Sequence, residues 1–334
     1  SAYLPYPHLF FPSFFSCSGP HLDLPSLHAP LPISPTPPSI LPPHLTTSTP
    51  TASPPLILSH PSILRLWSKH VMNDMPETII SLLSPLHGHD TDHLNLASIP
   101  NNATFCEQAN LACKADVDGI TPLSMAYGYS THPSLYPVDP LSYFKKSLLF
   151  TQSIMVNLPN LESQFPKRAF LPLKLSAKIP MNAKDLETHF PPSFQKAMLR
   201  KNMEISLMHC SAPNLQGEEK GCFNSLEGVI TFAQAAVRAN NQQIVALTSS
   251  CQGTHQGSQV VIRSVHQVGA NTSVSCHEIF FPFMAYYCHV LPSTQVFSVG
   301  VVSSKGLGAP DRGNGTILYA ICHLDTSSWP KGHP

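Results

Sequence analysis

The sequence predicts an α+β fold with three consecutive parts: a proline-rich leader, a small helical segment, and a larger unit whose C-terminal part is mainly antiparallel β. Three observations predict this arrangement. Proline is too dense for regular structure near the N-terminus, apolar residues then recur at helical spacing, and the last third of the chain alternates with a period of two. The expected segments are 1–60, 61–140 and 141–334.

Residues 1–60 consist mainly of Pro, Leu, Ser, His and Thr, and proline is densest from Leu31 to Pro55. Proline lacks a backbone donor and breaks helices and central strands, so this part is predicted to be a disordered leader with some polyproline II conformation. The apolar stretch HLFFPSFFSC contains a proline and makes a poor signal-sequence core. Because the chain starts at Ser1, we expect that a signal was removed or that the N-terminus is incomplete.

The helical segment begins with PSILRLWSKHVMNDMPETIISLLSPL, whose apolar spacing predicts two short helices separated at Pro76. Cys106 and Cys113 are seven residues apart, which favours a local disulfide. A metal site at this pair would need further ligands close in the sequence, and none is there. Residues 116–140 contain many Gly and Pro residues and are predicted to be a loop.

The third part begins with SLLFTQSIMVNL, whose alternation predicts a strand or hairpin, and PSFQKAMLRKNMEISLMHC predicts a helix. Cys210 and Cys222 bracket the polar stretch SAPNLQGEEKG, which predicts a small disulfide-closed loop. The remainder is predicted as one capped helix and six strands, in LEGVITFAQAAVRAN, IVALTSS, QVVIRSVHQV, SVSCHEIFF, AYYCHVL, QVFSVGVVSS and TILYAICHL.

Composition argues against several function classes. Lys+Arg and Asp+Glu both number 19 and no basic run occurs, so no nucleic acid partner is expected. No apolar run reaches the roughly 20 residues that span a bilayer, so no membrane segment is expected. No pair of carboxylates lies in a glycosidase setting, and no catalytic residue is assigned. The 18 histidines would make the chain cationic near about pH 5 to 6.

Two features favour a secreted, disulfide-permissive setting. The nine cysteines include no CxxC pair, and three N-glycosylation sequons are present. The expected glycosylation sites are Asn102, Asn271 and Asn314.

Cysteine precedes histidine three times in the predicted C-terminal strands, at Cys276-His277, Cys288-His289 and Cys322-His323. Neighbouring residues of a strand point to opposite faces, so each step sends its sulfur one way and its imidazole the other. One face could then hold disulfides or buried thiols, while the other gathers the three imidazole rings.

Clustered neutral imidazoles in an oxidising compartment suit Cu(II) or Zn(II), and copper is the stronger binder. The alternative is that the cysteines are structural and the histidines incidental. A zinc finger is disfavoured because adjacent Cys and His do not readily chelate one ion and the finger spacing is missing. A cysteine nucleophile with a histidine base is disfavoured because adjacent side chains of a strand diverge.

The Cys-His pattern resembles the BURP domain of plant proteins, which has four such repeats near its C-terminus. Ten residues separate the first two repeats, as in that family, 32 separate the second and third, and the fourth is absent. We therefore expect a C-terminally truncated BURP-like domain over about Leu141–Pro334. FPKRAFLP, NSLEGVITFA and the Cys210…Cys222 pair also resemble blocks of this domain.

Upstream, HPSILRLWSKHV and TFCEQANLACKAD resemble the polygalacturonase-1 non-catalytic beta subunit group, although the FxxY repeat array of that group is missing. This resemblance implies a secreted protein of the plant cell wall, or apoplast. It would associate with the polygalacturonase catalytic subunit and with pectin, and would modulate pectin metabolism without hydrolysing pectin.

Other BURP proteins imply two alternatives. One is a copper-dependent cyclase of ribosomal peptides, in which His277, His289 and His323 would be the copper ligands; no repeated core peptide is found in the chain. The other is a structural stress or seed protein.

Overall fold

The structure, a computed structural model, describes residues 8–10, 15–18, 61–86, 103–113, 144–151, 155–157, 165–179, 181–195, 197–237, 243–249, 259–268, 273–303, 316–325 and 327. It contains helices and two β-sheets, which confirms the α+β prediction. The predicted glycosylation sites Asn102, Asn271 and Asn314 lie outside the described residues, as do the predicted loop and most of the predicted leader.

The helices form where apolar spacing and caps predict them. Pro76 is the N-cap residue of α2 and separates it from α1, while the Ser225 hydroxyl caps α10 by accepting a hydrogen bond from the Gly228 backbone N at 3.2 Å. No helix in the described part of the chain has both the length and the apolar character needed to cross a bilayer. The helices are α1 (Pro61–His70), α2 (Glu77–Ile80), α4 (Ala103–Gln108), the 3-10 helix η3 (Lys146–Phe150), α6 (Leu173–Ser176), α7 (Ala183–His189), α8 (Pro191–Gln195), α9 (Ala197–Ser211) and α10 (Leu226–Ala236).

The strands form two sheets, called here sheet A and sheet B. Sheet A has the order β5-β9-β8-β1-β6, and sheet B has the order β3-β2-β11-β10-β7-β4. The strands are β1 (His8–Phe10), β2 (Phe15–Ser18), β3 (Phe144–Lys145), β4 (Met155–Asn157), β5 (Glu219–Phe223), β6 (Val245–Leu247), β7 (Gln259–Val268), β8 (Ser273–Phe280), β9 (Met284–Val290), β10 (Thr294–Ser303) and β11 (Thr316–His323).

Strand pairing is antiparallel through most of both sheets, as predicted for the C-terminal part. β9 pairs antiparallel with β5 and β8, and β10 pairs antiparallel with β7 and β11. Two short strands from the predicted leader join them: β1 runs parallel to β6 and β8, and β2 runs parallel to β3 and β11.

One local prediction is only half right. The stretch predicted as a strand or hairpin contains β4, but its first part is the 3-10 helix η3. Leu149 of η3 is buried with Phe297 and Val299 of β10 in the core of sheet B. One buried leucine is compatible with a strand or with a 3-10 helix, so the alternation of apolar residues could not distinguish these two conformations.

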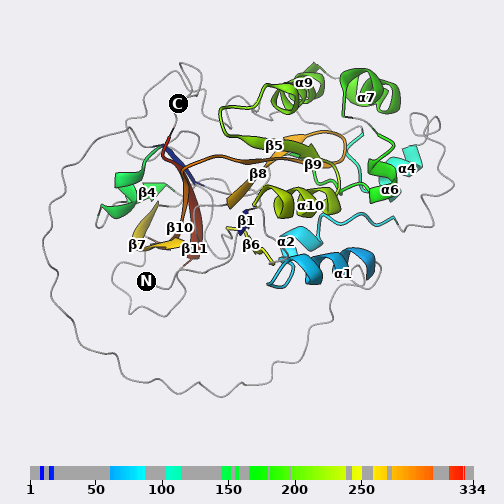
Figure 1. Ribbon diagram of the computed structural model, residues 1–334. Helices are drawn as coiled ribbons and strands as arrows, with labels where there is room; N and C mark the ends of the chain where they lie inside the picture. The colour runs from blue at the N-terminus through cyan, green and yellow to red at the C-terminus, as the bar shows by residue number, and fades with distance from the viewer. Residues whose placement is uncertain are drawn as a thin grey trace, which may run out of the picture.

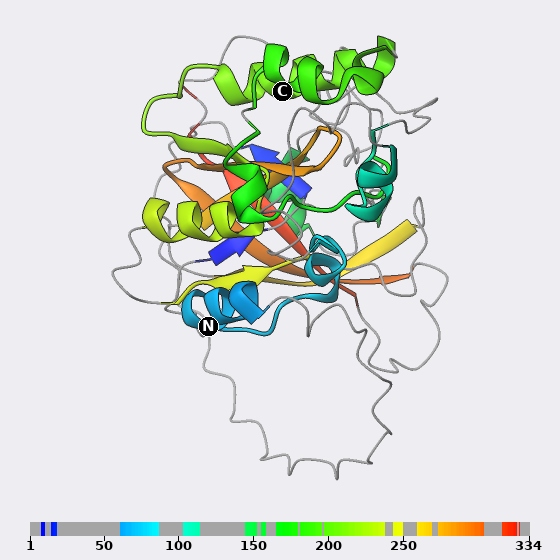
Figure 2. The ribbon, with the colours of Figure 1, turned by 90° about the vertical axis from the view of Figure 1, so that its right-hand side faces the viewer.

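Sheet A lies between two groups of helices, with α10 and α1 on one side and α9 on the other (Figures 1 and 2). On the α10 side, Trp67, Val229 and Ile230 share a buried core with Cys276 and Cys288 of the sheet. On the α9 side a second core forms around three phenylalanines at the β8–β9 turn, Phe280, Phe281 and Phe283. The sheet is therefore buried on both faces, and polar groups within it need partners.

A buried arginine, Arg168, connects the segment before α6 with the β8–β9 turn. The Arg168 side chain is 0% exposed and its guanidinium lies 2.8 Å from Glu278 Oε1 of β8. It also donates hydrogen bonds to the backbone oxygens of Ile279 (3.0 Å), Phe283 (3.2 Å) and Pro166 (3.1 Å). Burial lowers the pKa of Arg168, and the adjacent Glu278 carboxylate opposes that shift.

Candidate functional site

The β8–β9 hairpin sends its cysteines into the core. Cys276 and Cys288 are directly opposite each other in the strand register and form a disulfide with a Cα–Cα distance of 4.0 Å. Both are 0% exposed, in the core shared with α10 and α1. The sulfur atoms therefore occupy one face of sheet A.

The neighbouring imidazoles meet on the other face. His277 pairs in register with Tyr287, so His289, two residues further along β9, is its diagonal neighbour. Nε2 of His277 lies 3.2 Å from Nε2 of His289, and the ring centroids are 5.2 Å apart. The alternation expected from the sequence thus places these two rings side by side.

His323 joins them from sheet B. It ends β11, where it pairs with Thr294 at the start of β10, just after the turn that follows β9. Its ring centroid is 5.8 Å from that of His289, and its Nδ1 lies 3.0 Å from Thr294 Oγ1. The three rings, called here the histidine cluster, form where the chain passes from one sheet to the other.

Glu218 supports the cluster from the turn before β5. Its Oε1 accepts hydrogen bonds from Tyr287 OH at 2.9 Å and from His289 Nδ1 at 3.2 Å. Its Oε2 accepts one from the Leu215 backbone N at 2.8 Å and lies 3.8 Å from Lys220 Nζ. The side chain is only 3% exposed, so these partners replace the water that a carboxylate would otherwise bind.

This carboxylate remains ionised. Burial alone would raise the pKa of Glu218, but hydrogen bonds from His289, the Leu215 backbone N and Tyr287 hold it at about 2. The residue before it, Gly217, has φ +76°, and a Cβ there would lie 2.7 Å from Pro292 Cγ. Glycine is therefore required for the turn that aims Glu218 at the cluster.

His277 remains neutral. Burial lowers its pKa well below the ordinary 6.5, and the rings of His289, His323 and His209 lower it further. His209, in the last turn of α9, lies with its ring centroid 6.1 Å from that of Tyr287. A ring that resists protonation is available as a hydrogen-bond acceptor or as a metal ligand.

The two disulfides predicted from the sequence are also present, whereas the Cys276–Cys288 pairing was not predicted. Cys106 is bonded to Cys113 and Cys210 to Cys222, while Cys322, 0% exposed in the core of sheet B, is also disulfide-bonded. The Cys210–Cys222 bridge connects the end of α9 to β5 and closes the loop that contains Glu218. This bridge therefore helps to hold Glu218 beside the histidine cluster.

Sequence reasoning missed Glu218, Tyr287, Thr294, His209 and Lys220. Their roles depend on the pairing of β5 with β9 and of β10 with β11, which brings together residues far apart in the chain. Two weak signals existed: Glu218 is an acidic residue inside a predicted disulfide loop, and Tyr287 directly precedes a Cys-His step.

The donor chemistry of the cluster fits a borderline metal such as Cu(II) or Zn(II). Neutral imidazoles are ligands that both ions accept, and a carboxylate on the far nitrogen of His289 is the usual outer-sphere partner of a metal-bound histidine. In the described part of the chain, however, no three histidine, cysteine or carboxylate side chains already have the spacing of a metal site. The rings are close neighbours that would still have to adjust around an ion.

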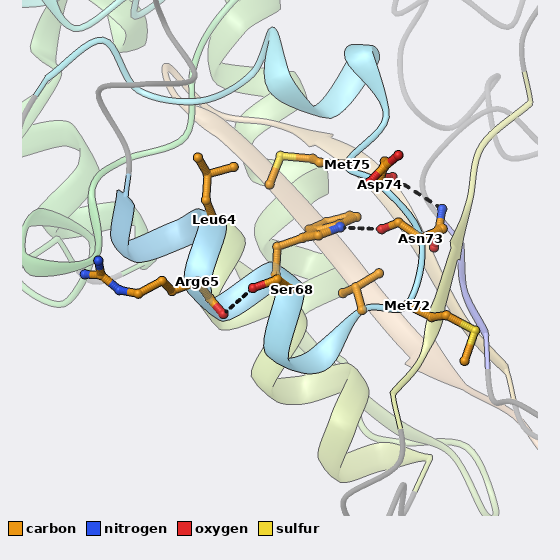
Figure 3. Close-up of a pocket in the computed structure, with 9 residues that line it drawn as sticks. Leu64, Arg65, Ser68, Met72, Asn73, Asp74 and Met75 are labelled. Carbon is orange, nitrogen blue, oxygen red and sulfur yellow. Dashed lines mark hydrogen bonds between the residues drawn. The ribbon is translucent and has the colours of Figure 1, made fainter.

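A separate hollow of about 450 Å³ lies beside α1 (Figure 3). Two of its polar side chains form hydrogen bonds within the lining: Trp67 Nε1 donates to Asn73 O at 2.8 Å, and Ser68 Oγ donates to Arg65 O at 3.2 Å. The Asn73 side chain bonds both backbone groups of Ala246 in β6 at 2.9 Å. These bonds dock the loop after α1 onto sheet A, and the histidine cluster is the better candidate site.

Comparison with known proteins agrees with the motif spacing. The profile of the BURP domain family matches residues 142–334. BURP domain-containing protein 16 of Oryza sativa subsp. japonica is 26% identical over 289 residues, which is 81% of this chain. Polygalacturonase-1 non-catalytic subunit beta of Solanum lycopersicum is 30% identical over 202 residues, or 59% of this chain. Polygalacturonase 1 beta-like protein 1 of Arabidopsis thaliana is 27% identical over 202 residues, also 59% of this chain.

The length of these relatives differs. The chain spans 80% of the rice protein but only 30% of the tomato protein and 31% of the Arabidopsis protein.

Proposed function

Since the chain belongs to the BURP domain family, we propose that it is a secreted plant cell-wall protein that associates with a polygalacturonase as a non-catalytic subunit. The supporting observation is its 30% identity to polygalacturonase-1 non-catalytic subunit beta over 202 residues. The disulfides in both helical and sheet regions fit an extracellular protein.

A binding assay tests this proposal. The full chain, purified with its disulfides intact, is immobilised and exposed to a purified polygalacturonase at wall pH, with an unrelated pectate-binding enzyme as control. We expect retention of the polygalacturonase alone and a change in its activity. Absence of retention at micromolar concentrations of both proteins contradicts the subunit role.

We also propose that pectin is part of this association. Pectin is a polyanion, and the chain has 18 histidines against balanced fixed charges, so its net charge becomes positive as the pH falls. Binding to polygalacturonate is expected to strengthen from about pH 7 to about pH 5. Because the pKa of His277 is lowered, H277N should keep the same profile. A flat profile for the unmodified chain contradicts the proposal.

A second candidate function is a copper-dependent peptide cyclase, favoured by the 3.2 Å approach of the two Nε2 atoms in the histidine cluster. His277, His289 and His323 would hold the copper, which would supply one-electron chemistry. Metal analysis after copper loading measures how much copper the chain binds. H289N is the test variant, and H266N, which changes an exposed histidine of β7, is the control. Mass spectrometry of peptides incubated aerobically with the loaded protein would show a loss of two hydrogens. Unchanged peptides and no bound copper contradict this candidate.

A further inference from the structure

The hydrogen bonds of Thr294 fix which nitrogen of His323 has the proton. Thr294 Oγ1 donates to the Leu291 backbone oxygen at 2.9 Å, and a carbonyl oxygen can only accept. The hydroxyl has one hydrogen, so it must accept in its 3.0 Å contact with His323 Nδ1. Neutral His323 is therefore protonated on Nδ1 and has its lone pair on Nε2.

Glu218 leads to the same result for His289 by an independent route. Both oxygens of Glu218 already accept hydrogen bonds, Oε1 from Tyr287 OH at 2.9 Å and Oε2 from the Leu215 backbone N at 2.8 Å. In the 3.2 Å contact with Oε1, His289 Nδ1 is therefore the donor. The lone pair of His289 is then on Nε2, the atom that faces His277 Nε2. His277 must donate in that contact, which makes it the ring with the opposite tautomer.

We propose that Glu218 and Thr294 are positioning residues that hold His289 and His323 in one tautomer, with both Nε2 atoms unprotonated, so that two of the three rings already have the nitrogen lone pair that a divalent ion needs. This deepens the second candidate function, the metal-holding histidine cluster. Of the three rings, only His277 is protonated on Nε2. Its proton has to move to Nδ1 before all three rings can bind one ion through Nε2.

The variant E218Q is a sharp test because the Leu215 backbone N–H fixes the orientation of the new amide. That N–H can only donate, so the glutamine oxygen takes the Oε2 position and the amide NH2 takes the Oε1 position. The NH2 then donates to His289 Nδ1, and the proton of His289 moves to Nε2. Two N–H groups cannot face each other across 3.2 Å, so His277 must change tautomer as well.

The measurement is long-range ¹H–¹⁵N NMR of the full chain labelled at histidine, with disulfides intact and metal removed. In the unmodified protein we expect Nδ1 protonation for His289 and His323 and Nε2 protonation for His277. E218Q should invert His289 and His277, while Thr294→Val should affect His323 alone. Y287F removes the other partner of Glu218 Oε1 and should leave all three tautomers unchanged.

Metal affinity gives the second readout. With Zn(II) as a diamagnetic probe, E218Q should bind about 10- to 100-fold more weakly, as is usual when the outer partner of a histidine ligand is lost, and Y287F should bind nearly as tightly as the unmodified chain. Unchanged tautomers in folded E218Q and in T294V would overturn the proposal. If the tautomers change as expected but no ion binds to the unmodified chain, the positioning roles remain and the metal function fails. If E218Q does not fold, T294V decides the question at His323.

Discussion

At the scale of single residues, Glu218 shows how a nearly dry carboxylate is kept charged. Its two oxygens accept from a phenol, an imidazole and a backbone amide, and Lys220 is 3.8 Å away. Each of these groups favours the ionised form, and together they outweigh the cost of burial. The residue therefore links stability to pH as well as orienting His289.

The first prediction concerns acid stability. Because the pKa of Glu218 falls from 4.5 to about 2 on folding, its contribution is complete above about pH 4.5 and is lost as the pH falls towards 2. Denaturant titrations in EDTA from pH 6 to pH 2 should show the unmodified chain losing on the order of 3 kcal/mol more than E218Q. Parallel curves for the two proteins would show that the carboxylate is not held in its charged form.

A second prediction follows from His277, at higher pH. Its pKa is lower in the folded chain than in the unfolded chain, so stability is highest above 6.5 and decreases as the pH falls below that value. H277N removes this dependence and should flatten the unfolding free energy between about pH 7 and pH 5. H266N, at an exposed position of β7, should keep the slope of the unmodified chain; a steep slope retained by H277N would contradict the assignment.

At the scale of elements, the β8–β9 hairpin sorts its side chains by face. The disulfide joins the two strands on the α10 side, directly behind the pair of imidazoles. A cross-strand bond at this point fixes the register of β8 and β9. A slip by one residue would move the imidazole of the slipped strand to the core side. The bridge thus contributes to the site without touching it.

The third prediction removes that bridge. C276A/C288A should lower the unfolding free energy by about 2 to 3 kcal/mol, the usual range for a loop of this length, and should broaden the imidazole NMR signals of His277 and His289. C106A/C113A removes a bridge of shorter separation near α4 and is the matched control. C106A/C113A should lower stability without changing the signals of His277 and His289. Equal effects of both variants on these signals would contradict a specific role of the Cys276–Cys288 bridge at the histidine cluster.

Local pattern was sufficient for these elements because their information is local. Apolar spacing and Pro76 predicted α1 and α2, Ser225 predicted the start of α10, and alternation predicted β6 to β11. Opposite directions of neighbouring strand residues predicted the separation of sulfur from imidazole. Partners across strands were not predictable, since periodicity says which face a residue occupies but not which strand lies beside it. Glu218 and Thr294 were missed for that reason.

At the scale of the whole molecule, one buried ion pair connects the segment before α6 with sheet A. Arg168 has no exposed side-chain surface, whereas the Arg200–Glu187 pair on the outer helices is 46% and 55% exposed. These two pairs of the described residues therefore allow a buried ion pair to be compared with an exposed one. A buried charge left without its partner is costly, while exposed pairs contribute little.

The fourth prediction compares these two pairs. R168M leaves Glu278 buried without its cation and should destabilise the chain by about 3 to 5 kcal/mol, and R168M/E278Q should recover part of that loss. R200A should change stability by less than about 1 kcal/mol. Thermal and denaturant unfolding measure both, and similar effects of R168M and R200A would contradict the buried network described for Arg168.

The bridge between Cys210 and Cys222 also has a consequence for how the protein must be made. It ties the last turn of α9 to β5 and so closes the loop that brings Glu218 to the imidazoles. In protein produced in a reducing cytosol, this disulfide would be missing, and the loop that contains Glu218 would no longer be closed beside the three imidazole rings. Oxidation therefore has to precede any loading with metal, and preparations should be assayed for free thiols before they are assayed for copper.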